Sequence, residues 1–149
     1  MLISDAGKAV YFNEKDARPM GRDTRGVKGI TLEENQSVIA LIMPNKDNEI
    51  LTVSENGYGK RSKVEDFRKT KRGAKGVIAM QLSERNGKLI SANQVSDEDQ
   101  VILISDKGTL VRTKVSEISV IGRNTQGVRV IKLKANEKLN GMALALEND

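Results

Sequence analysis

Three arginines, Arg22, Arg72 and Arg123, each stand four residues before a Gly-Val pair. The planar guanidinium group donates two parallel hydrogen bonds and therefore matches the oxygens of a phosphate group. A glycine beside it allows backbone N–H groups to approach the same anion. Residues of these types at this spacing predict a phosphate-binding loop that occurs three times in the chain.

These loops belong to a repeat that runs through all 149 residues. The glycines of the three Gly-Val pairs, Gly26, Gly76 and Gly127, are 50 and 51 residues apart, and each is preceded by another glycine 19 residues earlier. Self-similarity at such a period is typical of repeat architectures. We therefore interpret residues 1–149 as one domain built from three copies of a single unit, with bounds near 1–49, 50–99 and 100–149.

The positive charge follows the same repeat. The chain has a net charge of +5, but segments 7–29, 57–76 and 108–129 carry +3, +6 and +3, which leaves −7 for the remainder. A charge that recurs at the same part of every unit indicates one basic surface rather than general solubility. The sequence therefore predicts a surface that attracts a polyanion.

The basic side chains of this surface are the candidate contacts to phosphate. Alternative roles are solvated charges on a rim, ion pairs with acids of the neighbouring unit, or, for residues such as Lys60, Lys63 and Lys114, protection of an edge strand from unwanted pairing. The candidates for DNA contact are Arg18, Arg22, Arg25, Lys60, Arg61, Arg68, Lys69, Lys71, Arg72, Lys75, Arg112, Lys114, Arg123 and Arg129.

The chain lacks the residue types that most often carry out catalysis. The chain contains no cysteine and no histidine, which removes thiolate nucleophiles and the commonest general base and metal ligand. Tyr11 and Tyr58 are expected to pack beside turns, and Asp97-Glu98-Asp99 is expected to be a polar turn without metal-ligand spacing. We expect no catalytic residue, cofactor or metal in this segment. No apolar run approaches a membrane span, so we expect a cytoplasmic protein without membrane contact.

Local patterns predict an all-β fold. Short β-branched runs end at turns that contain glycine, as in Glu55-Asn56-Gly57 and Asp106-Lys107-Gly108. Segments 35–43 and 137–146 also fit a helix, but their recurrence in each unit favours strands. The expected strands are 38–42, 50–54, 60–64, 77–82, 89–92, 101–105, 110–115, 127–133 and 142–146.

Four short strands in about 50 residues are typical of a propeller blade. Three blades cannot close a ring, because radial β arrays typically contain four or more blades. We therefore expect a partial ring, which remains an open array, belongs to a larger ring, pairs with another copy, or exchanges strands between blades.

Four longer motifs resemble the C-terminal domain of the A subunit of bacterial DNA gyrase. They are SDKGTLVRTKVSEIS at 105–119, GRNTQGV at 122–128, NGYGKR at 56–61 and TKRGAKGV at 70–77. The resemblance covers essentially the whole chain, and topoisomerase IV carries a related domain. It implies a β-pinwheel, a propeller-like disc of typically six blades whose basic rim wraps double-stranded DNA, of which this chain resembles the last three blades.

The resemblance also implies a non-catalytic lobe of an ATP-dependent type II topoisomerase that contributes to DNA supercoiling. Its partners would be DNA, the remainder of the gyrase A subunit and, through it, the B subunit, which is the ATPase of gyrase, and its location would be the nucleoid. The family's wrapping box reads QRRGGKG, and the nearest segment here, KRGAKG at 71–76, lacks the glutamine and differs at two further positions. The alternatives are the equivalent lobe of topoisomerase IV and a propeller that binds proteins through its acidic segments 30–56 and 77–107.

Overall fold

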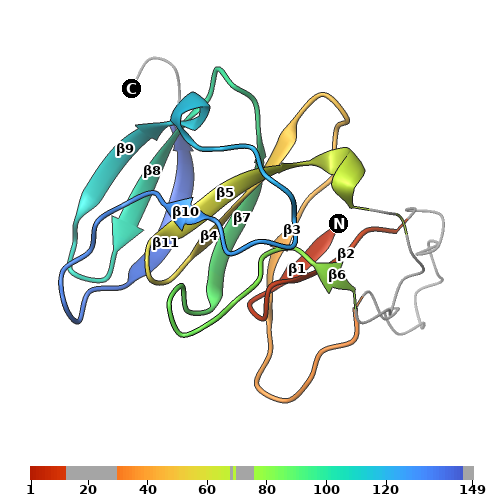
Figure 1. Cartoon of the computed structure of the whole chain (residues 1–149), viewed down its shortest axis with the longest axis horizontal. Helices are drawn as coiled ribbons and strands as arrows, with labels where there is room; N and C mark the ends of the chain where they lie inside the picture. The colour runs from red at the N-terminus through yellow and green to blue at the C-terminus, as the bar shows by residue number, and fades with distance from the viewer. Residues whose placement is uncertain (13–29, 68, 70–75, 146–149) are drawn as a thin grey trace, which may run out of the picture.

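A computed structural model of the chain describes residues 1–12, 30–67, 69 and 76–145, and these residues form an all-β structure (Figure 1). No α-helix occurs among them, so the helical alternatives for 35–43 and 137–146 are wrong and the strand interpretation is confirmed. The elements in chain order are β1 (Leu2–Ser4), β2 (Lys8–Val10), β3 (Val38–Leu41), β4 (Glu49–Ser54), β5 (Tyr58–Lys63), the 3₁₀ turn η2 (Val64–Asp66), β6 (Val77–Ile78), β7 (Leu89–Val95), β8 (Gln100–Ser105), β9 (Leu110–Lys114), the 3₁₀ turn η3 (Val115–Glu117), β10 (Val128–Arg129) and β11 (Leu139–Ala145).

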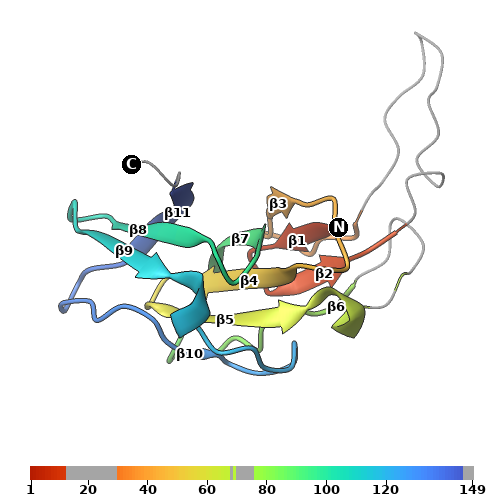
Figure 2. The same ribbon diagram turned by 90° about the horizontal axis from the view of Figure 1, so that it is seen from above.

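The strands form three antiparallel sheets. The first sheet has the order β3-β1-β2-β6, the second β10-β5-β4-β7, and the third β11-β8-β9. Strands β3, β7 and β11 are each at one end of their sheet, and we call them the inner strands. Strand β7 contacts both β3 and β11, so the inner strands of the three sheets are neighbours. Figure 2 shows β3, β7 and β11 on one side of the row of sheets and β10 on the other. This propeller-like row is the predicted partial β-pinwheel.

Strands are exchanged between repeats. The first sheet takes its outer strand, β6, from the second repeat, and the second sheet takes β10 from the third repeat. The register is the same in both cases, with Val77 opposite Ala9 and Val128 opposite Gly59. The sequence left this possibility open, and the structure shows that each four-stranded sheet is shared by two consecutive units.

The exchanged strands are shorter than the predicted strands 77–82 and 127–133. After two paired residues, the carbonyl oxygen of Gly57 accepts hydrogen bonds from the N–H groups of both Val130 and Ile131. The chain bends there, and the Ile131 side chain enters the core. Gly7 accepts the equivalent bonds from Ala79 and Met80. The apolar residues that follow the Gly-Val pair therefore pack into the core and do not extend the paired strand.

The middle sheet is covered on both faces. Along β4, Ile50 belongs to the core cluster shared with the first sheet, whereas Leu51 and Val53 belong to the cluster shared with the third sheet. All three side chains are fully buried. A strand that is buried on both faces reads as a continuous apolar run rather than an alternating one. This explains why the segment Ile50-Leu51-Thr52-Val53 is so apolar.

A buried serine closes the hairpin turn in every repeat. The hydroxyl oxygens of Ser4, Ser54 and Ser105 accept hydrogen bonds from the N–H groups of the residues four positions later. In the third repeat the Ser105 hydroxyl also donates to the carboxylate of Glu137 over 2.6 Å. Thr109 donates its hydroxyl to the same carboxylate, and the backbone N–H of Lys134 donates to its other oxygen.

These hydrogen bonds to Glu137 make the free energy of unfolding depend on pH in the acid range. The N–H of Lys134, followed by the hydroxyls of Ser105 and Thr109, lowers the pKa of Glu137 from 4.5 to about 2. A carboxyl group with a lowered pKa stabilises the folded state above its unfolded pKa and loses this effect as it is protonated. We expect Glu137→Gln to lower the free energy of unfolding at neutral pH. Urea denaturation should show the difference from the wild type shrinking between about pH 4.5 and about pH 2, and a difference that stays constant with pH would contradict this role.

Candidate nucleic-acid interface

We use the word rim for the outer strands β6 and β10, the C-terminal ends of β5 and β9, and the described residues of the loops that follow β5 and β9. Lys63 and Lys114 occupy the same position of successive repeats, each at the end of the second strand and directly before a 3₁₀ turn. Both side chains are exposed. Lys63 Nζ lies 3.9 Å from the carboxylate of Glu65, but both side chains are largely exposed, and such a pair contributes little. The repeat therefore presents an ammonium group at matching points of two sheets.

Two further candidates are exposed near these lysines. Along β9 the side chains of Leu110, Arg112 and Lys114 are exposed, while Val111 and Thr113 are partly buried, as expected for a period of two. Arg112 Nε donates a hydrogen bond to the side-chain oxygen of Gln100. The ammonium group of Lys69, also exposed, lies 5.3 Å from the centre of the Tyr11 ring. These residues remain candidates for phosphate contact.

Arg129 meets a second arginine at Tyr58. The hydroxyl oxygen of Tyr58 accepts hydrogen bonds from Arg85 Nε at 2.9 Å and from Arg129 Nη2 at 3.2 Å. Both guanidinium groups also lie over the ring, at 5.2 Å and 5.5 Å from its centre. The hydrogen bond from Arg85, and then that from Arg129, lowers the pKa of Tyr58. Arg85 was not a candidate from the sequence, because it lies in an acidic segment outside the repeated basic stretches.

Arg123 links the third repeat to the second. Its Nε donates to the carbonyl oxygen of Asp66 at 3.0 Å, and its Nη1 donates to that of Ile78 at 2.9 Å. The residue is half-buried. In this arrangement Arg123 holds its own loop against the turn η2 and the strand β6. The structure thus gives it a structural role that the predicted phosphate contact did not include.

Lys60 is inside the protein, which does not fit the predicted phosphate contact. Its side chain is fully buried, and Nζ donates hydrogen bonds to the carbonyl oxygens of Gly122 and Thr125 and to the Thr125 hydroxyl, at 2.9, 3.1 and 2.9 Å. Nζ also contacts the carbonyl oxygen of Arg123. The ammonium group therefore organises the rim loop 122–125 from beneath instead of facing solvent.

Burial has an electrostatic consequence for Lys60. Desolvation, assisted by the nearby charge of Arg123 and opposed by Asp66, lowers the pKa of Lys60 to about 8. The sequence contained a signal for this position, because the equivalent residues of the other repeats are Val10 and Val111. Because valine occupies this position in the other two repeats, the lysine is expected at an inward-facing position of the unit.

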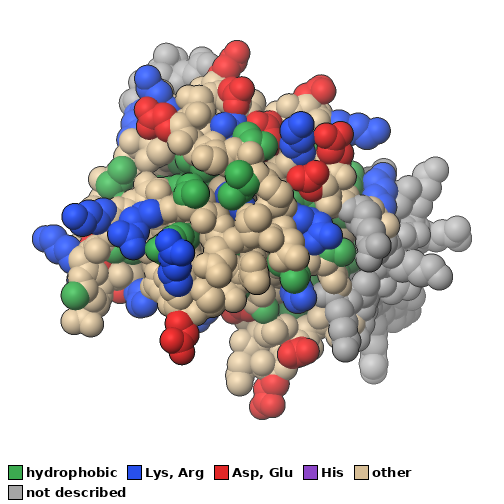
Figure 3. Space-filling model, viewed as in Figure 1, with side chains coloured by type: hydrophobic (Ala, Val, Ile, Leu, Met, Phe, Trp, Pro, Cys, Tyr) green, Lys and Arg blue, Asp and Glu red, His purple; other side chains and the backbone are tan. Residues whose placement is uncertain are grey.

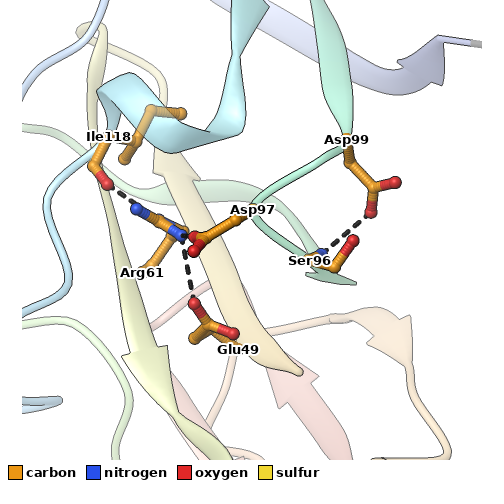
Figure 4. A network of polar contacts seen from close by, with 6 residues as sticks. All are labelled: Glu49, Arg61, Ser96, Asp97, Asp99 and Ile118. Carbon is orange, nitrogen blue, oxygen red and sulfur yellow. Dashed lines mark hydrogen bonds and ion pairs between the residues drawn. The ribbon is translucent and has the colours of Figure 1, made fainter. Parts of the chain in front are cut away.

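Arg61 is also buried, and it is not on an edge strand. Strand β5 pairs with β4 on one side and with β10 on the other, and beyond β10 the N–H of Arg61 donates to the carbonyl oxygen of Ser119. The side chain donates from Nε to the carbonyl oxygen of Ile118 at 2.7 Å and from Nη1 to Glu49 at 3.0 Å. Nη1 also forms an ion pair with Asp97 (Figure 4). Arg61 is thus a structural ion-pair residue and does not fit the predicted phosphate contact.

Neither acidic partner of Arg61 was recognised from the sequence. Glu49 opens β4, and Asp97 belongs to the turn between β7 and β8, 36 residues away from Arg61. The turn itself is confirmed, since the Ser96 N–H donates to the carboxylate of Asp99 at 2.9 Å (Figure 4). Spacing alone offers no signal for these pairs, because Glu49 and Asp97 lie 12 and 36 residues from Arg61 and meet it only when β4, β5 and the turn after β7 come together.

The remaining candidates lie outside the described residues. The candidates without a described position are Arg18, Arg22, Arg25, Arg68, Lys71, Arg72 and Lys75.

Figure 3 shows a group of Lys and Arg side chains over the region in which Figure 1 shows β9, β10 and β11. No group of metal-ligating side chains occurs among the described residues, and none of the described helical turns is long enough to cross a membrane.

The chain matches one protein family along its repeats. The family model described as "DNA gyrase C-terminal domain, beta-propeller" matches residues 1–45, 48–96 and 99–145. The A subunit of DNA gyrase from Escherichia coli (strain K12) is 49% identical over 147 residues. That match covers 99% of this chain but 17% of the relative, so the chain spans about one sixth of the length of that protein.

Two solved structures have the same fold. The structure of a DNA gyrase A C-terminal domain superposes with a TM-score of 0.85 at 32% identity, and the match covers 97% of this chain and 50% of that one. The C-terminal domain of a DNA topoisomerase IV superposes with a TM-score of 0.88 over 99% of this chain and 46% of that one. Its identity of 24% supports the shared fold alone.

Proposed function

The chain belongs to the family of DNA gyrase C-terminal domains, and from this premise we propose that its rim binds and bends double-stranded DNA as the accessory lobe of a gyrase A subunit. The matched domain is distinct from the catalytic core of that protein, so this segment is not itself catalytic. The proposed role requires no cofactor in this segment.

One observation carries the proposal: the exposed lysines Lys63 and Lys114 recur at the same point of successive sheets. Duplex DNA has about one negative charge per ~1.7 Å of axis, and cationic side chains that meet it release condensed counterions. A duplex that follows the rim would meet an equivalent ammonium group at the second and third sheets. Contacts of this kind hold the backbone and favour bending without reading bases.

The chain supplies little for another mode of nucleic-acid binding. It contains two Phe, two Tyr and no Trp, and the ring of Tyr58 is already covered by two guanidinium groups. Proteins that bind single strands depend on aromatic rings on which bases stack. Duplex backbone is therefore the better target.

Salt dependence tests the proposal directly. We expect the logarithm of the association constant for a duplex to fall linearly with the logarithm of salt concentration, by about 0.9 for each phosphate neutralised. Fluorescence anisotropy at several salt concentrations measures this slope, and energy transfer between dyes at the duplex ends measures bending. Affinity that does not respond to salt, or no binding at low ionic strength, would remove the proposed function.

In the complete protein, we propose that this lobe guides one DNA segment and thereby contributes to supercoiling. The remainder of the gyrase A subunit and, through it, the B subunit that hydrolyses ATP would be its protein partners, and the nucleoid in the cytoplasm would be its location. The 49% identity with a gyrase A subunit favours this assignment over topoisomerase IV.

One observation favours a second function, the protein-interaction propeller. Leu41 and Met43, at the end of β3 and just beyond it, are 76% and 75% exposed. Exposed apolar side chains that are adjacent often mark contacts with other proteins. The two functions differ in their response to charge reversal on the rim, which removes DNA binding and leaves a contact at β3 intact.

A further inference from the structure

A small cavity lies at the hairpin end of the second sheet, where the loop between β10 and β11 packs against it. Its volume is about 270 Å³, and Tyr58, the first residue of β5, lines it. The rim residue Lys63 is the last residue of the same strand, so the cavity and the proposed DNA path are at opposite ends of β5. Pockets for drug-sized ligands measure roughly 300–1,000 Å³, so this cavity suits a smaller ligand.

Cations dominate the lining of this cavity. Arg85, Arg129, Lys134 and Lys138 contribute four positive charges, and Glu137 contributes the one carboxylate among the lining residues, which leaves a net charge of +3. The Glu137 side chain is buried, and its carboxylate already accepts three hydrogen bonds from neighbouring donors. A hollow surface with this charge attracts an anion, and most strongly one that carries more than a single charge.

Two of these cations converge on one neutral oxygen. Arg85 Nε and Arg129 Nη2 both donate to the Tyr58 hydroxyl, and neither guanidinium group forms an ion pair with a carboxylate among the described residues. Two like charges at this separation repel each other, and an anion bound between them compensates the repulsion. The lowered pKa of Tyr58 agrees with this, since the hydrogen bond from Arg85, and then that from Arg129, favours negative charge at the phenol oxygen.

The repeat shows that the fold does not require this arrangement. Arg129 lies opposite Tyr58 in the second sheet, and at the equivalent point of the first sheet Ile78 lies opposite Lys8. In the third repeat the residue after the hairpin glycine is Thr109. A tyrosine between two arginines therefore occurs at one of the three equivalent positions, although all three units form the same hairpin.

The loop that carries Arg85 also departs from the repeat. Segment 82–89 runs from the repeated leucine to the first residue of the next strand, and it is one residue longer than its counterparts 32–38 and 133–139. The side-chain amide of Asn56 donates a hydrogen bond to the carbonyl oxygen of Arg85 at 3.2 Å. The longer loop is thus fixed against the hairpin turn, with the Arg85 side chain at the cavity.

We propose that this cavity binds a phosphate monoester, with Arg85 and Arg129 as the residues that hold its phosphate group. A phosphate monoester carries a charge of about −1.5 to −2 at neutral pH and three acceptor oxygens, whereas a carboxylate carries a single charge. Each guanidinium group keeps further N–H donors beside the one that Tyr58 accepts, and its planar fork matches phosphate oxygens. The same group is present on a small phosphorylated molecule and at the phosphorylated end of a nucleic-acid strand.

The first test uses the full chain without DNA, so its outcome is separate from that of the proposed function of the rim. Because the chain has two tyrosines and no tryptophan, Tyr11→Phe makes Tyr58 the sole source of tyrosine fluorescence. We expect ribose 5-phosphate to change this fluorescence saturably and ribose to leave it unchanged. Calorimetric titration of the wild type should give the same dissociation constant.

Single substitutions test the assigned residues. Arg85→Ala and Arg129→Ala should each weaken binding of ribose 5-phosphate at least about tenfold, because each removes a charge-assisted donor group. Both side chains are exposed, so both variants should fold, which circular dichroism checks. Lys107→Ala removes one positive charge at the next hairpin turn, outside the cavity, and should bind like the wild type. Equal losses in all three variants would overturn the proposal, because net charge alone would then explain binding.

A short duplex with and without a 5′-phosphate distinguishes the two sources of the phosphate group. A fluorescence change with ribose 5-phosphate assigns the cavity to a small molecule, and a change with the phosphorylated duplex alone assigns it to strand ends. An equal change with the unphosphorylated duplex would make the cavity part of the DNA path and would overturn the proposal. The absence of a saturable response to both phosphate monoesters would overturn it as well.

Discussion

Replacement of Lys63, Lys69 and Lys114 by glutamate is expected to weaken binding to duplex DNA on the order of a hundredfold at low salt. All three side chains are exposed at the rim. Each replacement would remove one proposed ammonium–phosphate contact and introduce a charge that repels the DNA backbone. The salt dependence of binding should also become shallower, by about 0.9 in slope for each phosphate contact that is removed. Anisotropy titrations of the two proteins with one duplex, at matched salt concentrations, measure both effects.

The matched control reverses three other lysines. Lys88, Lys107 and Lys138 are also exposed, but they lie near the hairpin turns, at the opposite end of the second strands from Lys63 and Lys114. Both variants lower the net charge by the same amount. We expect the control to lose far less affinity than the rim variant. Equal losses would show that net charge alone drives binding and would contradict a DNA path along the rim.

Loss of Arg61 is expected to produce the largest change in stability. Arg61→Ala leaves the carbonyl oxygen of Ile118 without its donor and leaves Glu49, whose side chain is 19% exposed, without its counter-ion. Removal of one partner from a buried ion pair typically costs about 3–5 kcal/mol, because the remaining charge is uncompensated. Asp97 adds little to this loss, since its side chain is 73% exposed. Urea denaturation at neutral pH measures the change in the free energy of unfolding.

The repeat provides a control at the same position. Arg112 is the counterpart of Arg61 in the third repeat, and it is exposed and hydrogen-bonded to Gln100, the counterpart of Glu49. Surface substitutions usually change the free energy of unfolding by about 0.5 kcal/mol or less. Arg112→Ala should therefore have a small effect. Similar losses for the two variants would contradict the structural role of the buried pair.

Much of the fold could be predicted from the sequence. The spacing of Gly26, Gly76 and Gly127 revealed the repeat, and β-branched runs between glycine turns predicted strands at β4, β8 and β9 close to their observed bounds. These features depend on local conformational preferences, such as the positive φ of a turn glycine. A local sequence pattern of this kind predicts that a strand forms, but it does not indicate which strand it pairs with. The exchange of β6 and β10 between repeats was therefore left open.

The candidate site was predictable only in part. Lys63 and Lys114 are exposed at the rim as a period of two suggests, whereas Lys60 and Arg61 are buried. The difference arises because β5 is covered on its outer side by segments 119–121 and 128–129 of the third repeat. Their burial is therefore a tertiary effect, and charge counts along one strand cannot detect it. Comparison with Val10 and Val111 identifies Lys60 as an inward position once the units are aligned.

The shared sheets have a consequence for how the protein is made. When residues 1–99 have left the ribosome, the second sheet still lacks β10, which comes from Val128–Arg129. Folding during synthesis normally proceeds from the N-terminus in complete units. Here the first and second units must each wait for the next unit with one edge open. Premature termination at a unit boundary would therefore damage the unit before the boundary as well as remove the one after it.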